Sequence, residues 1–119
     1  MNRNRIAVGA AVLAIFVVVG GVLIYSNRGS GGHNVTLNVT VTGAKTMSPS
    51  NLSAHQNDTV TINVMSDTDG EVHLHLYDII FNAKAGQTVS HTFKADKTGT
   101  CDIEWESTAT GLGQLVISP

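Results

Sequence analysis

From residue 34 onward, apolar and polar residues alternate with a period of two. In NVTLNVTVT, every second residue from Val35 to Val41 is apolar and the others are asparagine or threonine, which is the pattern of a strand with one buried and one solvated face. The same alternation returns in four later segments, separated by turn residues: Thr59–Ser66, Thr88–Lys94, Gly99–Glu106 and Leu112–Ser118. Because no later window has helical periodicity, residues 34–119 are predicted to form an all-β, Greek-key sandwich of about seven to eight strands.

A long apolar segment precedes this predicted domain. Residues 6–25 read IAVGAAVLAIFVVVGGVLIY and carry no charge, and about 20 helical residues span the roughly 30 Å core of a bilayer. We expect a transmembrane signal anchor. The alternative is a cleaved signal peptide, whose apolar region is shorter, roughly 7–15 residues, and ends in small residues at a cleavage site.

The charges that flank the apolar segment predict its orientation. Arg3 and Arg5 lie in the flank of residues 1–5, whereas Arg28 alone follows the segment, so the positive-inside rule keeps the N-terminus cytoplasmic. Residues 26–33 are rich in glycine and serine and are expected to be a flexible tether. The protein is therefore predicted to be a single-pass protein of the cell membrane with its C-terminal domain outside the cytoplasm.

The charge and cysteine content exclude several classes of function. Residues 26–119 contain nine acidic and five basic residues, and a mildly acidic domain without a basic stripe argues against nucleic-acid binding. Cys101 is the one cysteine of the chain, so no internal disulfide can form. Since Cys101 alternates with Ile103 and Trp105, we expect it to be a buried core thiol. No nucleophile–base set and no phosphate-binding loop stand out, so the protein is not expected to be an enzyme.

The order of the segments resembles the cupredoxins, and more closely the small cupredoxin-like domains of the EfeO type. MSPSNLSAHQNDTVTINV is similar to the family's F-x-P-x-x-(I/L)-x-V-x-x-G-D-x-V segment, and HLHLYD lies where the family has its first histidine ligand. AGQTVSHTF, KTGTCDIEW and GLGQLVIS complete a resemblance that covers Val35 to Pro119. The resemblance implies the cupredoxin sandwich and gives His73 the position of the family's first copper ligand.

The remaining copper ligands of the family have no counterpart in this sequence. A type 1 copper site also needs a cysteine, a second histidine and usually a methionine, which the family supplies from the loop after its penultimate strand. Trp105 stands where that cysteine belongs, and no histidine or methionine occurs between Asp102 and Pro119. We therefore expect neither a type 1 nor a binuclear copper centre.

His73 and His75 remain as candidate metal ligands. They project to the same side of one strand, with Cα atoms roughly 6.5–7 Å apart, so both imidazoles can bind one ion. A site needs a third ligand, and the candidates are Met65, Glu71, Asp78 and His91. In the alternative interpretation, both histidines are structural and hydrogen-bond to loop backbone or to acids such as Glu104. The acidic residues 102, 104 and 106 are otherwise expected to be the solvated face of their strand.

Two functional hypotheses follow from these observations. The first is a membrane-anchored, extracytoplasmic cupredoxin-like domain that binds copper at a non-blue site, through His73 and His75, for copper handling. The second is a metal-free sandwich that binds a partner in the cell envelope, because fold does not carry function with it.

Overall fold

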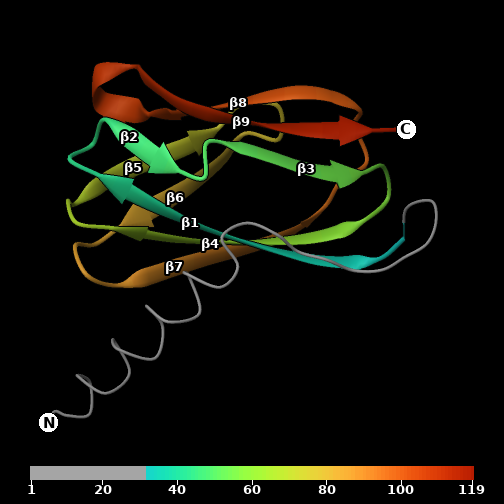
Figure 1. Ribbon diagram of the computed structural model, residues 1–119, viewed down its shortest axis with the longest axis horizontal. Coiled ribbons are helices and arrows are strands. Elements are labelled where there is room, and N and C mark those ends of the chain that lie inside the picture. Colours follow the sequence, from blue (N-terminus) through green and yellow to red (C-terminus); the bar gives the residue numbers. More distant parts are fainter. Residues whose placement is uncertain (1–31) are drawn as a thin grey trace, which may run out of the picture.

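The computed structural model describes residues 32–119, which form two facing β-sheets (Figure 1). The predicted flank 1–5, the predicted span 6–25 and most of the tether 26–33 lie outside the described residues. No helix within residues 32–119 is long and apolar enough to cross a membrane. The elements are β1 (Asn34–Thr42), β2 (Thr46–Ser48), β3 (Asn51–His55), β4 (Thr59–Ser66), β5 (Gly70–Leu74), β6 (Ile79–Ala83), β7 (Thr88–Lys94), β8 (Gly99–Trp105), the 3₁₀ helix η1 (Glu106–Thr108) and β9 (Thr110–Ser118).

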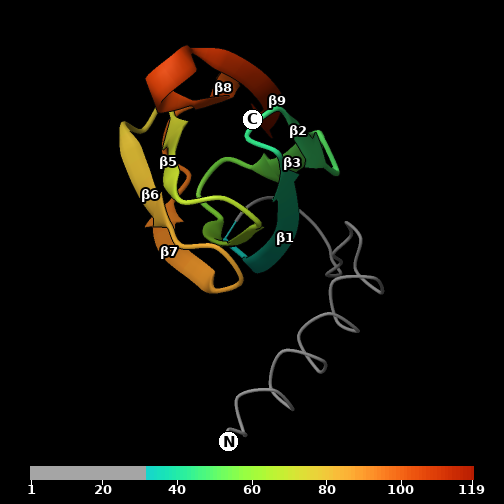
Figure 2. The same ribbon diagram turned by 90° about the vertical axis from the view of Figure 1, so that its left-hand side faces the viewer.

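The strands form one four-stranded and one five-stranded sheet. The orders are β2-β1-β4-β7 and β3-β9-β8-β5-β6, with β1 parallel to β4 and β3 parallel to β9. In the end-on view, the two sheets enclose the interior, and β6 lies beside β7 where the chain passes from one sheet to the other (Figure 2). The predicted all-β sandwich is confirmed for residues 32–119, which contain nine strands rather than seven or eight. The three-residue β2 has a single buried side chain, Met47, which is too short a pattern to read as alternation.

The predicted alternation places the core between the sheets. Every apolar residue from Val35 to Val41 on β1 is buried against the inner side chains of the other sheet. Phe81, Leu74 and Leu115 are almost fully enclosed, with exposures of 1%, 0% and 0%. Each such side chain contributes about 1.5–3 kcal/mol through removal of apolar surface from water.

A buried carboxylate, Asp58, fastens three parts of the chain at one end of the sandwich. Its side chain is 0% exposed. Oδ1 accepts the backbone N–H of His33 at 3.0 Å, and Oδ2 accepts the backbone N–H of His55 at 2.8 Å. Its backbone carbonyl accepts the N–H of Ala95, just after β7, at 2.8 Å. Asp58 therefore links the residues before β1 to the β3–β4 turn and to the end of β7.

Replacing Asp58 with alanine should lower the free energy of unfolding by about 2–4 kcal/mol, because the part-buried hydrogen bonds from the N–H groups of His33 and His55 lose their acceptor. Urea unfolding followed by the emission of Trp105, the one tryptophan of the chain, measures this change. Asp96→Ala is the control. The Asp96 carboxylate is exposed and lies 3.7 Å from Nζ of the exposed Lys97, and removal of such a surface ion pair should change stability by less than about 0.5 kcal/mol. Equal losses in the two variants would refute the anchoring role of Asp58.

Two glycines of β9 offer a matched test of close packing. A methyl group at Gly113 would lie 2.2 Å from the backbone oxygen of Ser50, whereas one at Gly111 would meet nothing within 4 Å. Because a backbone carbonyl cannot rotate aside, Gly113→Ala should cost about 1–3 kcal/mol or more, and Gly111→Ala should change stability by less than about 0.5 kcal/mol. Thermal unfolding of both variants measures the difference, and equal midpoints would contradict the close approach of β9 to Ser50.

Candidate metal site

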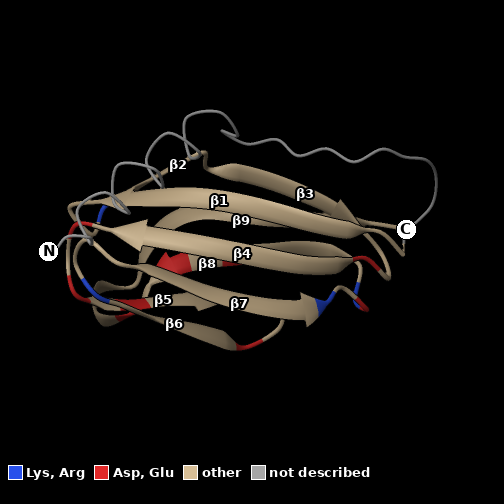
Figure 3. Ribbon diagram, turned by 90° about the horizontal axis from the view of Figure 1, so that it is seen from below, with Lys and Arg blue, Asp and Glu red and all other residues tan. Residues whose placement is uncertain are grey.

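The outer faces of the two sheets differ in chemistry. The four-stranded sheet presents uncharged polar side chains, and charged residues colour only the ends of its strands (Figure 3). Its side chains bond to one another across the strands: Asn63 donates to Asn38 at 2.7 Å, and the hydroxyls of Thr61 and Thr92 lie 2.8 Å apart. His73, His75 and Glu104 lie instead over β5 and β8 of the five-stranded sheet.

The burial of two β5 residues places the histidines on this outer face. Val72 and Leu74 point into the core with exposures of 1% and 0%, so His73 between them points outward. His75 follows in the turn after β5, and its backbone N–H donates to the carbonyl of Asp102 at 2.9 Å, which continues the pairing with β8. The ring centroids of His73 and His75 are 4.2 Å apart, and the ring planes are inclined by 35°.

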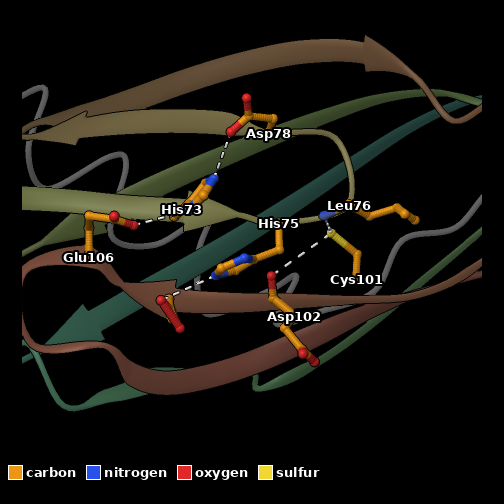
Figure 4. A network of polar contacts seen from close by, with 8 residues as sticks. His73, His75, Leu76, Asp78, Cys101, Asp102 and Glu106 are labelled. Atoms are coloured by element: carbon orange, nitrogen blue, oxygen red, sulfur yellow. Dashed lines mark hydrogen bonds and ion pairs between the residues drawn. The ribbon is translucent and has the colours of Figure 1, made fainter.

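Three carboxylates contact the two imidazole rings. His73 lies between Asp78 and Glu106, with Nε2 2.9 Å from Oδ1 of Asp78 and Nδ1 3.0 Å from Oε1 of Glu106 (Figure 4). Nε2 of His75 lies 3.2 Å from Oε2 of Glu104. These acids come from three places in the chain: the turn after β5, the start of η1, and β8, where Glu104 lies opposite His73. The turn brings Asp78 back toward β5 through a left-handed conformation at φ 53°.

The carboxylates determine the electrostatics of His73. The hydrogen bond to Asp78 raises the pKa of His73 above its ordinary value; burial opposes this shift, and the negative charges of Glu106 and Asp78 add to it. Nδ1 of His73 is buried and lies 3.0 Å from Oε1 of Glu106. Both ring nitrogens of His73 therefore face carboxylate oxygens.

The structure separates the four predicted candidates for a third ligand. Asp78 contacts His73, as described above, and Glu71 lies exposed on β5. Met65 is on β4 of the other sheet, where it lines a cavity of about 440 Å³ with Asp67 and Gly86. His91, on β7, packs edge-on against Phe81 with centroids 4.9 Å apart. Within residues 32–119, no group of three or more histidine, cysteine, aspartate or glutamate side chains is arranged to hold a metal ion.

Two acids of the cluster belong to the run 102, 104 and 106, which alternation predicts to be the solvated face of its strand. The alternative interpretation makes Glu104 a hydrogen-bond partner of the histidines, and Glu104 does contact His75. The role of Glu106 was missed, although this residue contacts His73. The pairing of β5 with β8 could have revealed Glu104, because His73 lies opposite it. Glu106 lies beyond that ladder, in η1, where alternation no longer predicts the direction of a side chain.

Cys101 is buried on the opposite side of β8, as predicted. Its exposure is 0%, and its sulfur accepts the backbone N–H of Leu76 at 3.3 Å. Burial raises the pKa of the Cys101 thiol, although the hydrogen bonds from Leu76 and Tyr77 oppose this shift. Because the thiolate is the reactive form, this sulfur is both inaccessible and in its unreactive state.

A thiol-alkylating reagent should therefore modify Cys101 slowly in the folded protein and rapidly in urea. Intact mass against time measures the rate. The control is the double variant Cys101→Ala, Thr100→Cys, which moves the thiol to the neighbouring exposed position on β8 and should react at least tenfold faster in the folded state. Comparable rates for the two folded proteins would contradict the burial of Cys101.

The fold is similar to that of solved copper-binding proteins, although the sequence matches no family model and no curated protein. A copper binding protein in its apo form is 11% identical with a TM-score of 0.64, covering 83% of this chain and 97% of that one. The metal binding domain of the Streptococcus pneumoniae Cu(I)-exporting P-type ATPase CopA, solved with Cu(I), is 10% identical with a TM-score of 0.63, covering 83% and 100%. Auracyanin B is 14% identical with a TM-score of 0.53, covering 84% and 97%. These likenesses show that residues 32–119 have a cupredoxin-like fold.

Proposed function

We propose that this chain is a membrane-anchored, extracytoplasmic cupredoxin-like domain that binds copper at His73 and His75 and serves in copper handling. The observation that carries the proposal is the pair of adjacent imidazole rings, 4.2 Å apart on the surface of the sheet. An imidazole nitrogen in its neutral form is a good ligand for copper. The fold likeness to proteins whose names include copper supports the choice of metal.

The residues of the core predict which kind of copper site this would be. A blue copper site needs a thiolate in the coordination sphere. Cys101 is the one thiol of the chain, and its sulfur is buried on the inner side of β8, whereas the histidines lie on the outer face. Trp105, at the position that the resemblance gives to the ligand cysteine, is 3% exposed and belongs to the core. Copper bound at His73 and His75 should therefore lack an intense thiolate charge-transfer band.

A metal-free envelope module is the second candidate, and one observation favours it. His73 has a carboxylate beside each of its ring nitrogens, and His75 has one beside Nε2. If both rings were protonated, their positive charges would balance carboxylate charges of the cluster without a metal. In that case the outer face of the five-stranded sheet would be an acidic surface available to a partner.

Copper titration of the full chain in detergent separates these candidates. The wild type should bind one copper ion without a thiolate band, and the double variant His73→Ala, His75→Ala should lose this binding because both imidazole ligands are gone. The double variant His55→Ala, His91→Ala is the matched control, since both histidines are exposed and lie on other strands, and it should bind as the wild type does. Metal analysis and optical titration measure the stoichiometry.

Each other outcome contradicts one candidate. Equal copper binding by the His73, His75 variant would show that the ion binds elsewhere. A wild-type protein that is free of metal after purification with copper would support the metal-free module instead.

A further inference from the structure

The turn between β5 and β6, residues 75–78, carries two residues of the candidate site, His75 and Asp78. Neither belongs to a strand, because β5 ends at Leu74 and β6 begins at Ile79. Within the turn, the backbone N–H of Asp78 donates to the carbonyl of His75 at 3.0 Å. The 4.2 Å separation of the two imidazole rings and the contact of Asp78 with His73 therefore depend on where this turn is held.

The first half of the turn is bound to β8 through its backbone. The N–H of His75 donates to the carbonyl of Asp102 at 2.9 Å. The N–H of Leu76 donates to the sulfur of Cys101 at 3.3 Å (Figure 4). The second half of the turn carries Asp78, and the side chain of the residue before it ties this half to another part of the fold.

The hydroxyl of that residue, Tyr77, bonds to the backbone of the turn between β7 and β8, residues 95–98. It donates to the carbonyl oxygen of Lys97 at 2.7 Å and accepts the backbone N–H of the same residue at 3.0 Å. Burial raises the pKa of Tyr77, so the phenol keeps the proton that it donates at neutral pH. One hydroxyl thus links two turns that are 20 residues apart in the sequence.

Ring contacts add to these hydrogen bonds. The Tyr77 centroid is 4.8 Å from that of Phe93 on β7, with the ring planes inclined by 44°, and Nζ of Lys97 lies 5.0 Å from the Tyr77 centroid. Tyr77 and Phe93 are partly buried and pack against the core. Such aromatic pairs contribute about 0.5–1.5 kcal/mol beyond the burial of their area, so packing and hydrogen bonding locate Tyr77 together.

The turn that receives the Tyr77 hydroxyl is itself fixed to the fold. Ala95, two residues before Lys97, is 0% exposed. Its N–H donates to the carbonyl of Asp58 at 2.8 Å, and its carbonyl accepts the N–H of Asn57 at 2.7 Å. Tyr77 therefore bonds to a support whose backbone is bound to the end of the sandwich that Asp58 anchors.

We infer that Tyr77 is a positioning residue of the candidate site: it holds the β5–β6 turn so that Asp78 reaches the His73 ring and His75 lies beside that ring. The hydroxyl acts through the backbone of the turn, because its own bonds are to Lys97, outside the site. The copper measurement below rests on the proposed function, whereas the arrangement of the rings can be tested without a metal.

The test uses Tyr77→Phe in the full chain in detergent, which removes the hydroxyl and keeps the ring. Two hydrogen bonds are lost, so amide hydrogen exchange within residues 75–78 should become about tenfold faster, while the amides of β1 and β4 exchange as in the wild type. Nuclear Overhauser contacts between the rings of His73 and His75 should weaken. Copper binding should weaken about tenfold, as it does when the support of a ligand is lost.

Thr61→Val is the matched control. It removes an exposed hydroxyl that lies 2.8 Å from that of Thr92 on the other sheet, and it should leave the exchange of residues 75–78, the ring contacts and copper binding unchanged. Changes of equal size in this variant would overturn the inference, because they would reflect a general loss of stability.

The outcomes separate this inference from the proposed function. Wild-type exchange in Tyr77→Phe would overturn the positioning role, and so would faster exchange with unchanged contacts between the rings. A wild-type protein that binds no copper would refute the proposed function, whereas faster exchange and weaker ring contacts in the variant would still support the role of Tyr77. Unchanged copper binding in a variant whose rings have separated would refute binding by both histidines and leave the positioning role intact.

Discussion

The antiparallel pairing of β5 with β8 brings the residues of the candidate site together. Val72 pairs with Trp105 and Leu74 with Ile103, and all four side chains are buried. The contact is close: a methyl group at Gly70 would lie 2.1 Å from the Trp105 indole. A slip of one residue would turn the apolar side chains outward and the histidine inward. The burial of these side chains therefore keeps His73 opposite Glu104 on the outer face.

The acid that anchors the fold is different from the acids of the candidate site. Asp58 is enclosed and accepts the backbone N–H groups of His33 and His55, so its loss leaves both groups without their acceptor. The acids around the histidines are partly or largely exposed, with Asp78 at 87%. Ion pairs in such positions contribute about 0–1 kcal/mol. The histidine cluster therefore adds little to the stability of the sandwich.

The fold likeness and the local residues give different information about copper. The solved neighbours show that this arrangement of strands occurs in copper-binding proteins, but a fold does not specify a site. In this chain, the position that the resemblance gives to the ligand cysteine is occupied by Trp105, which is buried in the core. The candidate ligands lie on the open face of a sheet, where side chains have room to move and water has access. The proposed site is thus a surface site on a cupredoxin-like scaffold.

Local sequence pattern was sufficient for much of the fold. The bounds predicted for the strands Thr59–Ser66 and Thr88–Lys94 agree with β4 and β7, and the burial of Cys101 followed from its alternation. In a strand with one buried face, the period of two in the sequence shows which side chains point into the core and which point outward. The same period predicted His73 and His75 on one strand, but β5 ends at Leu74 and His75 lies in the turn that follows. The three-residue β2 carried too little pattern to be found.

The partners of the histidines depended on contacts between distant segments. Alternation states that Glu104 faces outward, but not that β8 lies beside β5 with Glu104 opposite His73. Glu106 follows the end of β8 and enters a 3₁₀ helix, and Asp78 returns through a left-handed turn position, so no strand period applies to either. The face to which a strand side chain points depends on a few neighbouring residues, so the sequence alone could predict it. Which acids meet which rings is decided by strand order and register, because burial of the whole core selects them together.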